Sequence, residues 1–116
     1  MPHTPDERTA RIARFQTLVD DDPENELALF SLGQALQEAR RPAEAEGFLK
    51  RAYVLQPDLM MAWYRRGECL VQLGRWEEAR EMAQRTLDLA ISQHHVGPRQ
   101  DAEEMLEEIA DALTRK

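Results

Sequence analysis

The chain has 116 residues, a formal net charge of -7 and a composition that is 42% hydrophobic and 32% charged. This length suits one domain with a modest core, and only five Gly and six Pro favour a helical protein over a sheet or a disordered chain. No apolar run approaches the roughly 20 residues that span a bilayer, and the acidic balance argues against nucleic-acid binding. The single cysteine, Cys69, excludes an intramolecular disulfide.

The first predicted helix covers residues 5–20. Thr4 suits the N-cap, Pro5 the first helical position, and Glu7 completes a capping box. This helix resembles the second half of a later repeat, because Phe15 lies 34 residues before Leu49. We therefore expect it to cover the N-terminal side of the next helix with the apolar residues Ile12, Phe15, Leu18 and Val19.

Two units follow, over residues 26–59 and 60–93, in which Gly33 corresponds to Gly67 and Ala45 to Ala79. A Gly inside a helix costs roughly 1 kcal/mol relative to Ala, so two in register indicate that another helix packs very closely there. We expect one helical hairpin per unit, with helices over 26–39 and 43–55, then over 60–73 and 77–92. The residues predicted to face the glycines are Ala45, Leu49 and Ala52 in the first unit and Ala79, Ala83 and Leu87 in the second.

The spacing resembles that of the tetratricopeptide repeat (TPR) family, whose pattern is Trp-x2-Leu-Gly-x2-Tyr, then Ala-x3-Phe and then Pro. The first unit meets this pattern at Leu29, Leu32, Gly33, Leu36, Ala45, Leu49 and Pro57. The second unit meets it at Trp63, Gly67, Leu70 and Ala79, and departs from it at Arg66, Ala83 and Ile91.

The resemblance implies an all-α fold of TPR-type helical hairpin repeats, a fragment of an α-solenoid. It would hold two full repeats, an N-terminal half-repeat helix and a C-terminal capping helix in a single TPR domain over residues 1–116.

The last predicted helix covers residues 98–114 and follows a Gly97-Pro98 break. A polar outer face would suit a terminal element that closes the stack. A partner-binding role of this acidic face is an alternative, and so is a metal site with His94 or His95, although no Glu-x-x-His pair lies on one helix. Its acidic residues are Glu103, Glu104, Glu107, Glu108 and Asp111, and its apolar face is formed by Ala102, Met105, Leu106, Ile109 and Leu113.

The TPR resemblance implies a concave groove lined by the first helix of each hairpin. Positions that flank each glycine stripe by one or two residues would face this groove, and several of them are apolar or aromatic, as partner-binding surfaces often are. A competing interpretation is that the groove is closed by the terminal helices, with Leu27 and Phe30 against the first and Tyr64 against the last. The predicted partner-binding residues are Leu27, Phe30, Gln34, Met61, Tyr64, Arg65 and Glu68.

The sequence thus predicts a small TPR adaptor that binds a peptide or protein in the groove, where Arg65 is the candidate contact for an acidic group. The alternative is a structural or oligomerisation module, or a regulatory subunit of a larger assembly, because two full repeats are fewer than the three usually needed for stability. Without a catalytic arrangement of His, Cys or Ser, we expect no enzymatic activity, no cofactor and no metal. A cytoplasmic monomer or weak homodimer is expected, since the N-terminal segment has no apolar export signal.

Overall fold

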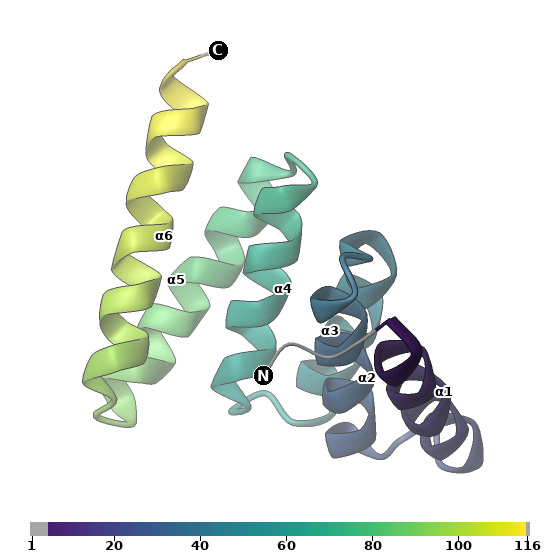
Figure 1. Cartoon of the computed structure of the whole chain (residues 1–116). Helices are drawn as coiled ribbons and strands as arrows, with labels where there is room; N and C mark the ends of the chain where they lie inside the picture. The colour runs from purple at the N-terminus through teal and green to yellow at the C-terminus, as the bar shows by residue number, and fades with distance from the viewer. Residues whose placement is uncertain (1–4, 116) are drawn as a thin grey trace.

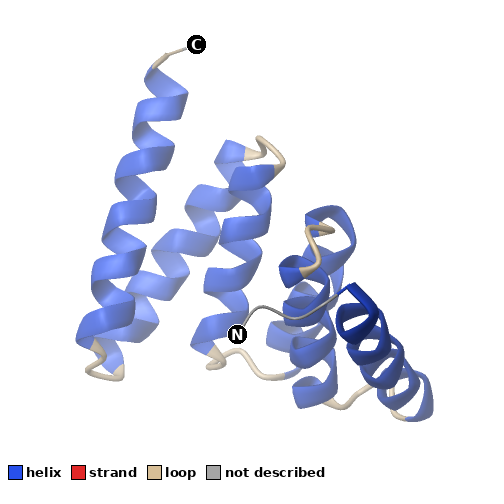
Figure 2. Cartoon of the chain, in the orientation of Figure 1, coloured by secondary structure: helices blue, strands red, loops and turns tan. Residues whose placement is uncertain are grey.

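In the computed structural model, which describes residues 5–115, the chain forms six helices, and no strand occurs within this range (Figure 1 and Figure 2). The predicted all-α class built from helical hairpins is confirmed. Thr4, the predicted N-cap, lies outside the described residues. The helices are α1 (Pro5–Asp21), α2 (Glu26–Glu38), α3 (Pro42–Leu55), α4 (Met60–Gln72), α5 (Trp76–Ser92) and α6 (Val96–Thr114).

The helices form a curved array in which each one packs mainly on its neighbours in sequence. Helices α2 and α3 form the first hairpin and α4 and α5 the second, while α1 packs against α2 and α6 against α5 (Figure 1). The two ends of the array are therefore single helices. Because α2 also contacts α4 directly, the first helices of the two hairpins lie side by side on one face of the array.

The core is one continuous cluster that runs from Val19 on α1 to Ile109 on α6. The leucine stripe of α2 is almost completely inaccessible to solvent, as its 3–4 spacing predicts. The corresponding stripe of α4 is less completely buried, because Trp63, the counterpart of Leu29, is only partly buried. The largest fully buried apolar side chains are Leu29, Leu32, Leu36, Leu49, Leu70 and Ile109.

The two helical glycines mark close contacts, but with different partners. A Cβ on Gly33 would lie 2.6 Å from Leu49 Cγ and 3.3 Å from the carbonyl oxygen of Ala45, so α2 and α3 meet there as predicted. A Cβ on Gly67 would instead lie 3.0 Å from Met105 Sδ on α6 and 3.3 Å from Met82 Cβ on α5. The sequence analysis expected Ala79, Ala83 and Leu87 to face Gly67, whereas the nearest atoms belong to Met105 of α6 and Met82 of α5.

The start of α6 also differs from the prediction. Gly97 and Pro98 were expected to break the chain, yet the helix begins at Val96 and both residues lie in its first turn. A proline fits there because the first backbone N–H groups of a helix have no partner within the helix. The break lies before Val96, where His94 adopts a positive φ of 60°.

A buried charge joins three helices. Arg66 on α4 is 6% exposed, and its Nε donates to Glu46 Oε1 on α3 at 2.8 Å. Its Nη1 donates to the hydroxyl of Tyr53 at 3.0 Å, and its Nη2 lies 3.5 Å from Glu78 Oε2 on α5. This residue departs from the TPR pattern, which has Leu at the position, and here it connects the two hairpins.

Candidate partner-binding groove

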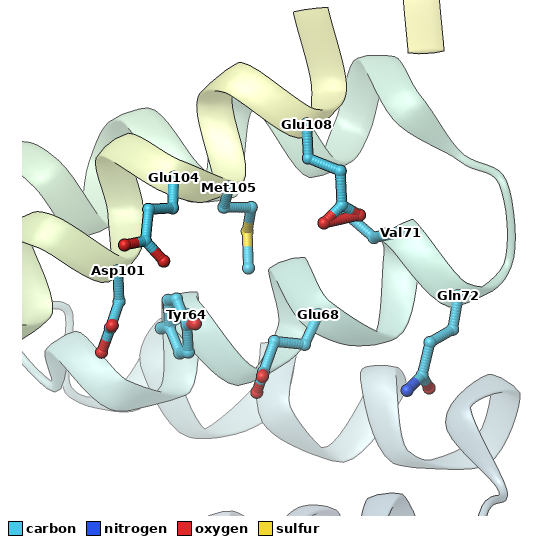
Figure 3. Close-up of a pocket in the computed structure, with 8 residues that line it drawn as sticks. All are labelled: Tyr64, Glu68, Val71, Gln72, Asp101, Glu104, Met105 and Glu108. Carbon is cyan, nitrogen blue, oxygen red and sulfur yellow. The ribbon is translucent and has the colours of Figure 1, made fainter. Parts of the chain in front are cut away.

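A cavity of about 330 Å³ lies between α4 and α6, on the face where the first helices of the hairpins meet. We call it the α4–α6 cavity. Figure 3 shows Met105 and Glu108 of α6 pointing toward α4, whereas Glu68 and Gln72 of α4 point away from α6. It is lined by Tyr64, Glu68, Val71 and Gln72 on α4 and by Asp101, Glu104, Met105 and Glu108 on α6.

Helix geometry explains the α6 wall of this cavity. Positions 101, 104, 105 and 108 are three or four residues apart and share one face of the helix. Met105 lies at the edge of the buried stripe and forms part of the floor, while Asp101, Glu104 and Glu108 are exposed at its rim. Helix α6 therefore presents a row of carboxylates to the groove.

Glu68 is the carboxylate on the opposite wall, and a short polar chain orients it. Gln37 on α2 donates through Nε2 to Glu68 Oε1 at 3.1 Å, and Arg65 Nη1 lies 3.4 Å from Gln37 Oε1. Arg65 Nε is buried with no hydrogen-bond partner among the described residues. The guanidinium of Arg65 is thus directed toward α2, and it does not line the α4–α6 cavity.

The phenol of Tyr64 is partly buried beside the carboxylates of the cavity. Burial raises the pKa of Tyr64 to about 12, and the carboxylates of Glu68, Asp101 and Glu104 contribute to the shift. Ionisation would place a further negative charge in a partly desolvated acidic site. Tyr64 therefore stays neutral at physiological pH and offers the cavity a hydroxyl and an aromatic ring.

The sequence-predicted residues are distributed unevenly around the groove. Tyr64 and Glu68 line the α4–α6 cavity, whereas Phe30 is partly buried against the core and Leu27 is 62% exposed. The other three, Gln34, Met61 and Arg65, are half-buried and lie outside the cavity.

The terminal helices cover the predicted groove residues unevenly. Leu27 is 62% exposed, so α1 does not cover it, whereas Tyr64 is partly buried and lines the α4–α6 cavity together with residues of α6. Helix α6 forms a wall of the α4–α6 cavity, where Glu104 and Glu108 of its acidic face are solvent-exposed lining residues.

The sequence analysis named Glu104, Met105 and Glu108 on α6 and gave partner binding by the acidic face as an alternative, but it did not place them in the groove and did not name Asp101. The α6 lining residues share one helix face; they are Asp101, Glu104, Met105 and Glu108. Their three- and four-residue spacing predicts this face if α6 is treated as the first helix of a third hairpin.

Two further features bear on function. No group of three or more His, Cys, Asp or Glu side chains within the described part of the chain is arranged to hold a metal ion. Among residues 5–115, none of the helices combines the length and the hydrophobicity that crossing a bilayer requires.

Comparison with known proteins identifies the family. Residues 10–86 match the family described as "Anaphase-promoting complex, cyclosome, subunit 3", which is of the TPR type. This match covers more than half of the chain, and the chain therefore belongs to this TPR family, as the repeat spacing predicted. No curated protein matches the chain.

Several solved structures have the same fold. The first TPR of Spaghetti (RPAP3), bound to the HSP90 peptide SRMEEVD, is 26% identical over 89% of this chain and 77% of that chain, with a TM-score of 0.78. The first TPR domain of human RPAP3 is 25% identical over 94% and 81%, with a TM-score of 0.79. The Yersinia enterocolitica type III secretion chaperone SycD, in complex with a peptide of the translocator YopD, is 21% identical over 94% and 82%, with a TM-score of 0.84.

Proposed function

We propose that this protein is a small, non-enzymatic TPR adaptor of the cytoplasm that binds a peptide or protein segment in its groove. The α4–α6 cavity is the observation that carries the proposal. It lies on the face formed by the first helices of the hairpins, it is open, and Tyr64, Val71 and Met105 give it an apolar floor. Aromatic and Met side chains are common where peptides bind, because they supply contact area without demanding one partner shape.

The RPAP3 relative supports the mode of binding, since that TPR domain is bound to a short peptide. The similarity supports a peptide as the kind of ligand and does not transfer the identity of that peptide. The sequence hypothesis that Arg65 contacts an acidic group of the partner has less support, because Arg65 is directed toward Gln37 and its Nε is buried.

Site-specific photo-crosslinking tests the proposal. A photoreactive amino acid replaces Gln72, an exposed residue at the cavity rim, and a matched control carries it at Arg80 on α5, which lies outside the cavity. We expect polypeptide crosslinks in the source cell from position 72 and not from position 80, and we expect Tyr64→Ala to reduce them. Equal crosslinking from the two positions, or none from position 72, would contradict groove binding.

The alternative of an oligomerisation module rests on a different observation. Large apolar side chains are exposed on the single helices that end the array, with Leu18 on α1 45% exposed and Val96 on α6 70% exposed. Such residues suit a contact between copies through the ends. Light scattering at increasing protein concentration distinguishes the two: a constant monomer mass contradicts the module, and a mass that doubles and is reset by Leu18→Ser supports it.

A further inference from the structure

The carboxylates of the α4–α6 cavity form no ion pair within the described residues, and Arg65 is the one cation that acts on the cavity's Tyr64. Four of its eight lining residues are carboxylates, and no basic residue lines it. The ion pairs of the described chain, which include Arg66 with Glu46 and Arg99 with Glu103, involve none of these four. The one polar contact from the protein is neutral, the amide of Gln37 on Glu68.

From this complementarity we infer that the occupant of the α4–α6 cavity is a segment of a partner polypeptide that presents a Lys or Arg side chain next to an apolar one. The inference rests on the proposed function and specifies its ligand. Both walls carry carboxylates: Asp101, Glu104 and Glu108 lie on α6, and Glu68 lies on α4 with its carboxylate turned toward Gln37 of α2 (Figure 3). A cation inserted between the walls would meet negative charge from two directions.

The floor of the cavity accounts for the apolar part of the ligand. Met105 and Val71 offer aliphatic and thioether surface, with Val71 beside Glu108, and the ring of Tyr64 lies near Asp101 and Glu104 (Figure 3). A Lys or Arg stem packs on such surface while its charged end stays with the carboxylates, and an aromatic face also attracts a cation. A cavity of about 330 Å³ holds an apolar side chain as well as the stem.

The same features distinguish a polypeptide from smaller cations. A metal ion requires several oxygen ligands at about 2–2.6 Å from one centre. No group of three such side chains is found among the described residues. A polyamine would satisfy the carboxylates but would leave the apolar floor uncovered. A peptide side-chain pair uses both.

Peptide selection provides the test. The probe is a positional-scanning array of ten-residue peptides, in which one position is fixed as one amino acid and the other positions are equal mixtures. We expect the whole chain to prefer the mixtures with fixed Lys or Arg, and to bind the acidic peptide SRMEEVD more weakly than them. The preference should weaken between about 0.05 M and about 0.5 M NaCl, because screening acts on partly exposed charges.

A pair of matched variants assigns this preference to the cavity. Glu104→Gln with Glu108→Gln removes two charges from the wall while keeping the side-chain shape, and we expect about a tenfold loss of affinity for the best basic peptide. Glu103→Gln with Glu107→Gln changes the net charge equally on residues of the same helix that lie outside the cavity, and should change affinity less than about twofold. Circular dichroism confirms that both variants keep the helical fold.

The outcomes separate this inference from the function on which it rests. Peptides that bind with an acidic or purely apolar preference would overturn the basic ligand and leave groove binding intact. Equal losses in the two double variants would overturn the cavity as the site. If Ca²⁺ or spermine alone shifts the NMR signals of Tyr64 and no peptide mixture binds, the inference and the proposed peptide-binding function both fail.

Discussion

The indole of Trp63 lies face to face on the phenol ring of Tyr53, with the ring centroids 3.6 Å apart and the planes 10° from parallel. Trp63 lies on α4 in the second hairpin and Tyr53 on α3 in the first, so the stack connects the two hairpins. The indole Nε1 donates to the carbonyl oxygen of Pro57 at 2.8 Å, and the guanidinium of Arg85 lies 5.5 Å from the ring centre.

Two substitutions of Trp63 should distinguish the contribution of the ring stack from that of the hydrogen bond to Pro57. Trp63→Ala removes the stack and the contact to Pro57, and we expect a loss of about 3 kcal/mol in the free energy of unfolding, at the lower end for a tryptophan because the ring is only partly buried. Trp63→Phe keeps an aromatic ring on Tyr53 and should lose only about 1 kcal/mol. Urea unfolding measures both, and equal losses would show that the stack itself contributes little.

The glycines allow a graded test of helix packing. Gly33→Ala should destabilise by about 1–3 kcal/mol, because its Cβ would lie 2.6 Å from Leu49 Cγ and close to a backbone oxygen. Gly67→Ala should be milder, since the atom that it meets at 3.0 Å belongs to the flexible Met105.

Gly47→Ala is the control for this series. Its Cβ would meet nothing within 4 Å, so helix propensity should raise stability by about 0.5–1 kcal/mol. Thermal unfolding followed by circular dichroism ranks the three variants, and a Gly67→Ala loss larger than that of Gly33→Ala would contradict the packing described for the two sites.

The repeat pattern made most of the fold predictable. Gly33 and Gly67 set the register, and each pair of helices must bury the same stripe, so the sequence determines where the hairpins lie. The α4–α6 cavity was less accessible to this reasoning because the strict period ends in α5, which has 17 residues where α3 has 14. The sequence analysis treated α6 as a capping helix and not as the first helix of a third hairpin, so it did not place the row Asp101, Glu104 and Glu108 opposite Tyr64.

The buried charge of Arg66 should respond unequally to the removal of its partners. Glu46→Ala leaves the 6%-exposed guanidinium with the Tyr53 hydroxyl and, as its one remaining carboxylate, Glu78 at 3.5 Å, and we expect a loss of about 3 kcal/mol. Arg66→Leu restores the residue of the TPR pattern, and Glu46 keeps its contact with Arg75, so stability should stay within about 1 kcal/mol of the unmodified chain. Urea unfolding measures the loss of stability in both variants. A larger loss in Arg66→Leu than in Glu46→Ala would show that the charge of Arg66 stabilises the fold.

Three turns of the array share a left-handed residue after the helix. Arg40, Gly74 and His94 have φ values of 62°, 72° and 60°, and in each turn the next N–H donates five residues back, as from Arg41 to Leu36. Only the second turn has the favoured glycine. Arg40→Gly should therefore raise the free energy of unfolding by about 0.5–1 kcal/mol, and Gly74→Ala should lower it by a similar amount. Calorimetry measures both shifts, and a destabilising Arg40→Gly would mean that the arginine side chain holds the turn.

The pKa of Tyr64 predicts a loss of stability in alkali. An unfolded tyrosine ionises near pH 10, whereas Tyr64 in the folded protein has a pKa of about 12, because of burial and then the carboxylates of Glu68 and Asp101. Above pH 10 the unfolded chain therefore releases a proton that the folded protein retains, and stability falls as the pH rises from about 10 to about 12.

Below pH 10 this group has no effect on stability. Tyr64→Phe should make the decline with pH shallower without abolishing it, because the pKa values of Tyr53 and Cys69 are also raised. The measurements are urea midpoints at pH values from about 8 to about 11, together with the tyrosinate absorbance of the variant, in which Tyr53 is the remaining phenol. A slope unchanged by Tyr64→Phe would show that the phenol of Tyr64 ionises as readily in the folded chain as in the unfolded one.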